Sequence, residues 1–182
     1  LQALIGTAFA VLALNFPDER GLTPASTAIS FARDIPWLDL AFAGPAIGVI
    51  LFVIWSNLIT TATTNAVNLT DGLDGLATGA TAMITGAYVL MSLFQSSQSC
   101  AIEGTRGCYE VRDPMDLALL AAILTGSLLG FLWWNTSPAK IFMGDTGSLG
   151  LGGALAGFAI FTRTEILVAV LAGLMVAIPL SV

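Results

Sequence analysis

The segment NAVNLTDGLDGLATG, residues 65–79, lies between two apolar stretches that are each long enough to cross a membrane. The preceding stretch covers residues 39–62, and the following one continues to about Phe94. A helix needs about 20 mainly apolar residues to span the hydrocarbon core of a bilayer. The segment also holds Asp71 and Asp74, for which the sequence offers no basic neighbour. It therefore indicates both the fold class and a candidate site.

The composition of the whole chain indicates a membrane protein. The 182 residues are 56% hydrophobic and only 10% charged, whereas a soluble domain carries about 25% charged residues. The mean hydropathy is +0.88. Because backbone groups in lipid must be satisfied within the protein, we expect an all-α polytopic membrane protein with a multi-helix transmembrane bundle.

Apolar segments recur along the chain and predict about four complete spans plus two partial ones. The complete spans are residues 39–62, the run that ends near Phe94, residues 116–134 and residues 147–161, and the partial spans are residues 1–14 and 166–182. Gly-x-x-x-Gly spacings such as Gly153/Gly157 predict close packing between helices. We interpret residues 1–182 as a single transmembrane unit and as an internal piece of a longer protein, because both ends lie inside apolar runs.

Alternating spans sort the polar connections onto two faces of the membrane. One face receives residues 15–38, 95–115 and 162–165, and the other receives residues 62–72 and 135–146. The short connection TRTE, residues 162–165, is expected to be an exposed turn. The span count predicts that NAVNLTDGLDG meets NTSPAKIFMGDTGS, residues 135–148, at one membrane edge.

The charges do not decide which face is cytoplasmic. The face without the acidic segment holds all the arginines, which are Arg20, Arg33, Arg106, Arg112 and Arg163. The positive-inside rule would make that face cytoplasmic, but the same face also carries all of the twelve acids except Asp71, Asp74 and Asp145. The two cysteines, Cys100 and Cys108, also lie there. They would form a disulfide if that face is extracytoplasmic, and two free thiols are the alternative.

The acidic segment has the spacing of one helical face. Asn68, Asp71 and Asp74 follow one another at intervals of three residues, which places them on the same side of a helix. Thr70 could cap such a helix at its N-terminus. Acids in a first helical turn suit the helix dipole, so a purely structural role is one alternative. The glycine after each aspartate favours a ligand instead, because it leaves room for close approach.

A second acidic motif is FMGDTGSLGLGG, residues 142–153, in which Asp145 stands where a loop enters an apolar helix. With Asn135 ten positions before it, three carboxylates and several amides should converge without basic residues. Such a cluster persists where a cation binds, and oxygen ligands without histidine or cysteine favour magnesium, manganese or calcium. Glycine-lined helix N-termini suit phosphate. The alternatives are an ion or proton pathway in a transporter, or capping and packing alone.

The segments NAVNLTDGLDGLA, residues 65–77, and FLWWNTSPAKIFMGDTGSLGLGG, residues 131–153, resemble the signatures of a known family. It is the phospho-N-acetylmuramoyl-pentapeptide transferase family, within the polyprenyl-phosphate N-acetylhexosamine-1-phosphate transferase superfamily. The resemblance implies a ten-helix enzyme of the bacterial inner membrane, often a homodimer, with no nucleic-acid partner. It would transfer phospho-MurNAc-pentapeptide from UDP-MurNAc-pentapeptide to undecaprenyl phosphate, giving lipid I and UMP, with Mg²⁺ as cofactor.

Relatives in the superfamily that move another UDP-linked N-acetylhexosamine-1-phosphate remain an alternative, and an ion-coupled transporter is a more distant one. The chain would correspond to the end of the fourth helix through the start of the ninth. The family's paired aspartates of an earlier loop and its later histidine cluster have no counterpart in this chain, which contains no histidine. We therefore do not expect this piece alone to be catalytically complete.

The resemblance also implies roles for individual residues. Asp145 matches the magnesium-binding aspartate, and Phe142 matches an aromatic residue that stacks on uracil. The catalytic positions implied are Asp71, Asp74, Asn68 and Asn135, and the further substrate-binding positions are Leu69, Gly72 and Asn65. Because the donor is a cytoplasmic nucleotide sugar, the acidic face would be cytoplasmic. The cysteine loop would then be extracytoplasmic, which favours the disulfide.

Overall fold

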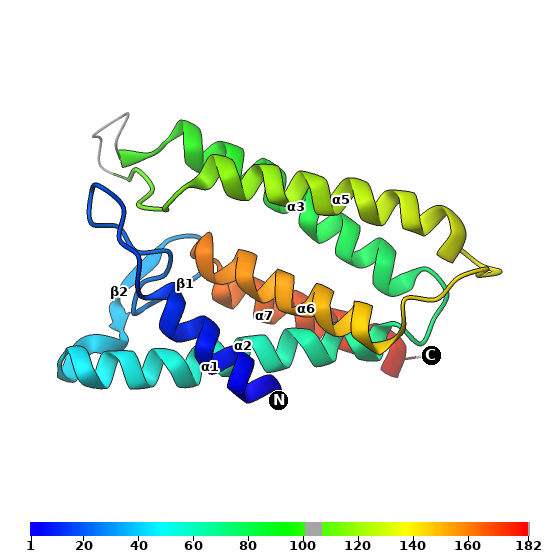
Figure 1. Ribbon diagram of the computed structural model, residues 1–182, viewed down its shortest axis with the longest axis horizontal. Helices are drawn as coiled ribbons and strands as arrows, with labels where there is room; N and C mark the ends of the chain where they lie inside the picture. Colours follow the sequence, from blue (N-terminus) through cyan, green and yellow to red (C-terminus); the bar gives the residue numbers. More distant parts are fainter. Residues whose placement is uncertain (101–106, 182) are drawn as a thin grey trace.

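Helix α2 runs along one side of an elongated helical bundle (Figure 1). The computed structural model describes residues 1–100 and 107–181, and within them the α-helices are α1 (Gln2–Ala13), α2 (Pro45–Thr70), α3 (Leu76–Ser97), α5 (Pro114–Asn135), α6 (Gly144–Phe161) and α7 (Glu165–Leu180). Helix α2 packs against α1, α6 and α7, whereas α3 and α5 pack mainly against each other. The expected all-α membrane bundle is confirmed.

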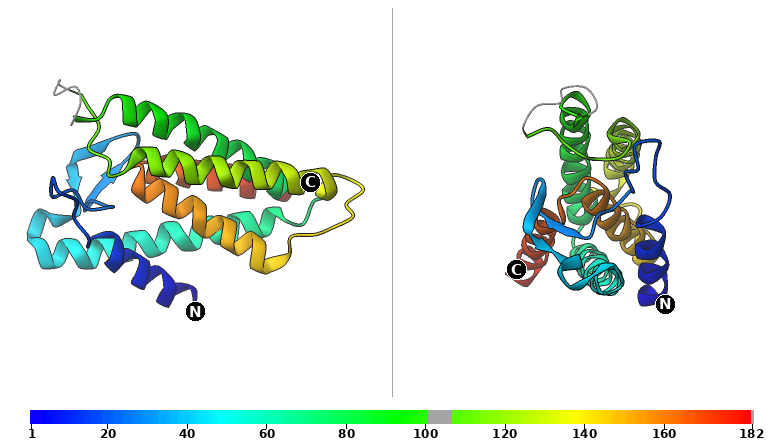
Figure 2. Two further views of the ribbon diagram at one scale, coloured as in Figure 1. Left: turned by 45° about the horizontal axis from the view of Figure 1, so that its top comes forward. Right: turned by 90° about the vertical axis from the view of Figure 1, so that its left-hand side faces the viewer.

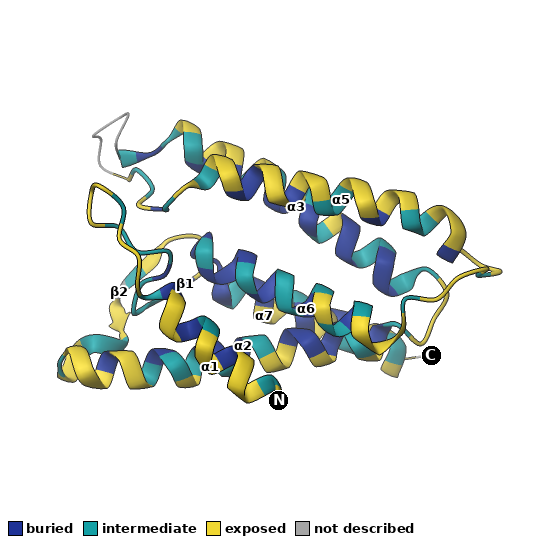
Figure 3. Cartoon of the chain, in the orientation of Figure 1, coloured by how far each residue is buried: buried dark blue, intermediate teal, exposed yellow. Residues whose placement is uncertain are grey.

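Three helices in the described part of the chain, α2, α3 and α5, are long and apolar enough to cross a membrane. Helix α6 takes the place of the fourth expected span, but it has 18 residues and is rich in glycine. Figure 3 shows many exposed residues along α5. The exposed apolar residues of this helix include Leu119, Leu120, Ile123 and Leu129. Apolar side chains on the outside of a bundle suit contact with lipid tails.

Helix α6 approaches α2 closely at Gly152. A Cβ atom added there would lie 2.7 Å from the Thr63 carbonyl oxygen and closer still to the Thr64 Cα. The two backbones therefore touch, which is the small-residue packing expected in membranes. The contact does not come from the predicted pair, because a Cβ at Gly157 would meet nothing within 4 Å and one at Gly153 only the Thr64 side chain at 4.0 Å.

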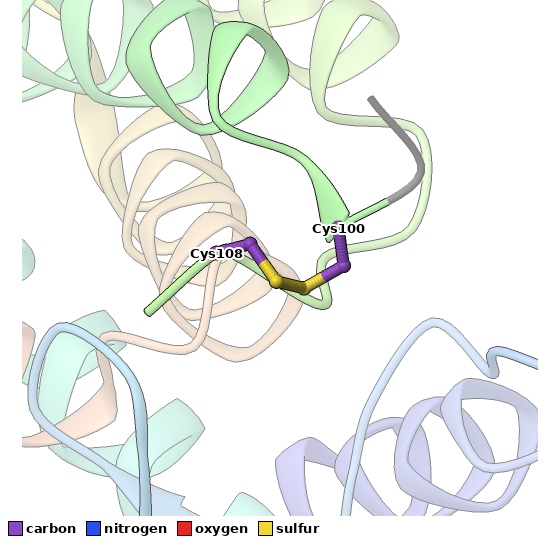
Figure 4. The surroundings of a disulfide bond; sticks show 2 residues. All are labelled: Cys100 and Cys108. Carbon is purple, nitrogen blue, oxygen red and sulfur yellow. A yellow bond between two sulfur atoms is a disulfide. The ribbon is translucent and has the colours of Figure 1, made fainter. Parts of the chain in front are cut away.

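The two ends of the bundle differ (Figure 2). At one end, an antiparallel hairpin of β1 (Ala28–Ser30) and β2 (Asp34–Asp39) leads into the 3-10 helix η1 (Leu40–Ala43). A disulfide joins Cys100 to Cys108 at the same end (Figure 4). The other end consists of the connections between α2 and α3 and between α5 and α6.

The turn TRTE, residues 162–165, is buried at the hairpin end, so the expectation of an exposed turn was wrong. The Glu165 carboxylate accepts a hydrogen bond of 3.0 Å from the Ser30 backbone N–H. The Gln95 side chain donates to the Thr162 carbonyl oxygen at 2.8 Å. These partners come from distant parts of the chain, so the local polarity of the turn could not reveal its burial.

The close approach at Gly152 predicts a specific sensitivity to an added methyl group. Gly152→Ala should lower the free energy of unfolding of the full-length protein by about 1–3 kcal/mol, because the new Cβ forces the helices apart. Gly157→Ala on the same helix is the matched control, since it gains the same helix propensity without a clash. Thermal unfolding in detergent measures both variants. Equal stability of the two would contradict the close contact.

Candidate active site

The last turn of α2 meets the first turn of α6 at the end of the bundle opposite the disulfide (Figure 1). The Asn68 amide nitrogen donates to the Asp145 carboxylate at 3.1 Å and to the Ser148 hydroxyl at 2.9 Å. Asn68 and Asp145 are 77 positions apart in the sequence. The prediction that the two acidic segments meet at one membrane edge is therefore confirmed by direct contacts.

Asp71 follows the last residue of α2 and lies next to Asp145. Partial burial raises the pKa of the Asp71 carboxyl, and the negative charge of Asp145 raises it further. A hydrogen bond from the backbone N–H of Gly144 acts in the opposite direction. Neither carboxylate forms an ion pair with a described residue. The nearest amine in the sequence, that of Lys140, lies over the Trp134 ring, 5.2 Å from its centre.

The expectation that Asn68, Asp71 and Asp74 share one helical face was wrong. Helix α2 continues to Thr70, and the chain then turns through residues 71–75 before α3 begins. Thr70 therefore ends a helix, and its hydroxyl donates to carbonyl oxygens in α2 and α7. Gly75 has φ of +75°, a left-handed conformation that glycine adopts without strain, so this glycine shapes the turn.

Asp74 lies in this turn and accepts a hydrogen bond of 3.1 Å from the Ala139 backbone N–H. Its carboxylate thus ties the α2–α3 turn to the connection between α5 and α6. Among the described residues, no three acidic, histidine or cysteine side chains gather as a metal-binding group. The site consists of a close pair, Asp71 and Asp145, with Asp74 holding a neighbouring loop.

Asn135 is 3% exposed, and both its amide oxygen and its amide nitrogen form hydrogen bonds. Its oxygen accepts from the Thr78 hydroxyl at 2.7 Å, and its nitrogen donates to the Ile141 carbonyl oxygen at 2.9 Å. Asn135 therefore anchors the loop that carries Phe142. Thr78 was not among the residues predicted for the site. Ser148 stands three positions after Asp145 in the second acidic motif, but no role was predicted for it.

The remaining predicted residues lie exposed at this end of the bundle. Phe142 is 70% exposed and borders a groove of about 300 Å³ between α5 and α6. Leu69 and Gly72 are also exposed. The Asn65 amide donates to the Thr61 carbonyl oxygen of its own helix at 2.7 Å. In the described part of the chain, no hydrogen bond from their side chains reaches Asp71 or Asp145, so their roles stay predictions.

The aspartate pair fits a hard divalent cation. Two carboxylates held together without a base repel each other, and after burial this repulsion by Asp145 is the second cause of the raised pKa of Asp71. Magnesium commonly binds through one or two carboxylates and completes its shell with water and phosphate oxygens. The N-terminus of α6 has no side-chain cap and lies beside the pair, and the backbone N–H groups of a helix N-terminus favour an anionic ligand.

Membrane-length helices with an acidic pair at one end of the bundle define a polytopic membrane protein with a candidate site at that end. Residues 8–163 match the family model described as Glycosyl transferase family 4. The chain therefore belongs to this family, and the membership inferred from the two motifs is confirmed.

Curated relatives match the whole chain. The phospho-N-acetylmuramoyl-pentapeptide-transferase of Micrococcus luteus is 98% identical over 182 residues, which is 100% of this chain and 48% of that protein. Proteins of the same name from Pseudarthrobacter chlorophenolicus and Renibacterium salmoninarum are 68% and 70% identical, over 100% of this chain and 50% of each of them. The chain spans about half the length of the curated relatives it matches.

Repulsion within the pair predicts a pH-dependent stability. Without divalent cations near neutral pH, Asp145→Asn should raise the free energy of unfolding by about 1 kcal/mol or less, because one like charge is removed. The asparagine oxygen can still accept from Asn68. The folded-state pKa of Asp71 lies above the unfolded value, so the wild type gains stability as the pH falls through that range. The difference between the two proteins should shrink on acidification.

Thermal unfolding between pH 7 and pH 4 in a chelator measures this difference. Glu19→Gln, an exposed change at the other end of the bundle, controls for the loss of one negative charge. A variant that is less stable than the wild type at neutral pH would contradict repulsion between Asp71 and Asp145.

Proposed function

We propose that the full-length protein transfers phospho-MurNAc-pentapeptide from UDP-MurNAc-pentapeptide to undecaprenyl phosphate, which yields lipid I and UMP. The observation that carries this proposal is the unneutralised pair of Asp71 and Asp145 at the end of α2 and α6. Membership in Glycosyl transferase family 4 supports it. So does the 98% identity to a protein named phospho-N-acetylmuramoyl-pentapeptide-transferase.

In this proposal Asp145 would hold Mg²⁺, with Asp71 beside it. The bound ion would supply charge neutralisation for the donor diphosphate. Asn68 keeps the Asp145 carboxylate in place through its hydrogen bond of 3.1 Å, and Ser148 receives the second bond of the same amide. The backbone N–H groups at the start of α6 would face the phosphates. The chain's own residues would thus bind and position the donor diphosphate. The acceptor phosphate would then attack the donor phosphate that is attached to the sugar, and UMP would leave.

The donor nucleoside would lie on the loop between α5 and α6. Phe142 presents an exposed ring on which uracil could stack. Asn135 and Asp74 would act as positioning residues, because each fixes this loop by hydrogen bonds. Leu69, Gly72 and Asn65 would border the approach to the aspartate pair. The bilayer would deliver the polyprenyl acceptor along the apolar helix surfaces.

We further propose that the acidic end faces the cytoplasm of a bacterial inner membrane. The disulfide at the opposite end supports this orientation, because disulfides persist in oxidising compartments. The five arginines predicted on the disulfide side suggest the reverse orientation, but several of them do not act as free surface charges. Arg20 pairs with Asp18 at 3.0 Å, and Arg112 pairs with Asp113 at 2.8 Å. Arg163 is buried, and Arg106 lies outside the described residues.

The position of the acids argues against an ion-coupled transporter. Acids that carry ions across a membrane lie within spans and face a cavity. Asp71 follows the end of α2, and Asp145 is in the first turn of α6. A related transferase that uses another UDP-linked N-acetylhexosamine stays open as the second candidate. Competition between UDP-MurNAc-pentapeptide and UDP-N-acetylglucosamine for the purified protein separates the two transferases. Homodimer formation stays a prediction.

The first test removes the proposed metal ligand. Asp145→Asn in the full-length protein should lower UMP release by at least about 100-fold, because metal binding contributes several kcal/mol to catalysis. The measurement is UMP formation from UDP-MurNAc-pentapeptide and undecaprenyl phosphate at saturating Mg²⁺. Glu19→Gln should keep wild-type activity. Full activity of a folded Asp145→Asn protein would rule out the assigned role of Asp145.

The second test concerns the donor nucleoside. Phe142→Ala should raise the KM for the UDP-linked donor by about tenfold to 100-fold, since stacking on a base contributes about 1–3 kcal/mol. The KM for the lipid acceptor should change little. Trp133→Ala, which truncates another exposed aromatic residue near this end, is the control. An unchanged donor KM for Phe142→Ala would remove Phe142 from the nucleoside site.

A further inference from the structure

A polar pocket of about 270 Å³ lies at the end of the bundle opposite the aspartate pair. Its walls include Arg163 from the turn after α6, Arg33 and Asp34 from the hairpin, and Glu110. The Cys100–Cys108 disulfide borders the same space. None of these residues takes part in the proposed transfer reaction, so the pocket calls for its own explanation.

Arg163 is the unusual member of this pocket. Its side chain is 5% exposed, yet it forms no ion pair with a described residue. One guanidinium nitrogen, Nη2, donates to the Thr23 carbonyl oxygen at 3.4 Å, and neither Nε nor Nη1 has a hydrogen-bond partner among the described residues. A buried charge without a partner is strongly unfavourable. Arg163 also has φ of +59°, a conformation that a non-glycine residue rarely adopts.

Of the three acids whose charges act on Arg163, which are Asp34, Glu165 and Glu110, the first two accept hydrogen bonds from other groups. Asp34 accepts hydrogen bonds from the hydroxyls of Ser30 at 2.6 Å and Ser26 at 3.0 Å. Glu165 accepts from the Ser30 backbone. Burial lowers the pKa of Arg163, and the surrounding carboxylates only partly offset that effect. Two edges of the guanidinium are therefore left for a group that enters the pocket.

We propose that this pocket binds a phosphate group, with Arg163 as its main ligand and Arg33 at its rim. A guanidinium presents a planar fork of donors that matches phosphate oxygens. The Arg33 side chain is exposed and lies over the Tyr109 ring, 4.3 Å from its centre, so it is held close to the pocket. Asp34 and Glu110 can accept hydrogen bonds from hydroxyl groups of a phosphate ester.

Two sources share this chemistry, a lipid headgroup and free phosphate. The hairpin beside the pocket carries exposed aromatic side chains, Phe31 and Trp37. Such residues are typical of the membrane–water interface, where lipid phosphates lie. The pocket lies at the other end of the bundle from the aspartate pair. Phosphate binding there can therefore be tested independently of the proposed transferase activity.

The test uses the full-length protein and two probes. Inorganic phosphate is titrated at constant ionic strength against thermal unfolding in detergent. Separately, the protein is reconstituted in nanodiscs that contain phosphatidylcholine and phosphatidylglycerol. Native mass spectrometry then measures how much phosphatidylglycerol the protein retains. Arg163→Gln should weaken binding of the responding probe by about tenfold or more, because hydrogen bonds to a charged group are lost.

Arg33→Gln is the second variant, since an exposed change at the rim should not disturb folding, and it should weaken binding in the same direction. Arg20→Gln, at the same end but paired with Asp18, should bind as the wild type does. A phosphate response lost in both pocket variants identifies free phosphate. Loss confined to phosphatidylglycerol retention identifies the lipid headgroup. Equal responses of all four proteins, or none in the wild type, would overturn the proposal.

Discussion

The contact between the backbones of α6 and α2 at Gly152 controls the geometry of the acidic end. A side chain there would overlap Thr63 and Thr64, so only glycine lets the two helices lie this close. The approach brings the start of α6 beside the last turn of α2. Asn68 can then reach both Asp145 and Ser148, although these residues belong to a helix far along the chain. The candidate site is thus a consequence of helix packing.

Helix packing also explains how two like charges stay together. Asp71 terminates α2, and Asp145 stands in the first turn of α6, so neither can move apart from its partner without shifting a whole helix. A loop would relax away from such repulsion. The bundle therefore holds the pair in readiness for a positive charge, which is the preorganisation that a cation site needs.

The meeting of Asp71 and Asp145 at one end of the bundle could be predicted from the sequence, because it depends only on topology. A helix that enters the membrane must leave on the other side, so counting spans was enough to bring Asp71 and Asp145 to one end. The detailed geometry was out of reach because it depends on where α2 stops. The spacing of Asn68, Asp71 and Asp74 suits a helix, but the chain turns at DGLDG, with Gly75 in a left-handed conformation. The buried turn at Arg163 was missed because its cover, the hairpin, lies more than a hundred positions earlier.

The repulsion at the acidic end has a thermodynamic consequence for the proposed reaction. A bound cation would reduce the negative charge that a diphosphate meets at the site, and the diphosphate would add oxygen ligands for the cation, so each should bind more tightly in the presence of the other. The described part of the chain would offer the ion the carboxylates of Asp71 and Asp145, and diphosphate oxygens would supply further ligands. Asp71 and Asp145 alone would hold the ion weakly. Donor binding and cation binding should therefore be one coupled event, and the raised pKa of Asp71 should fall as that event occurs.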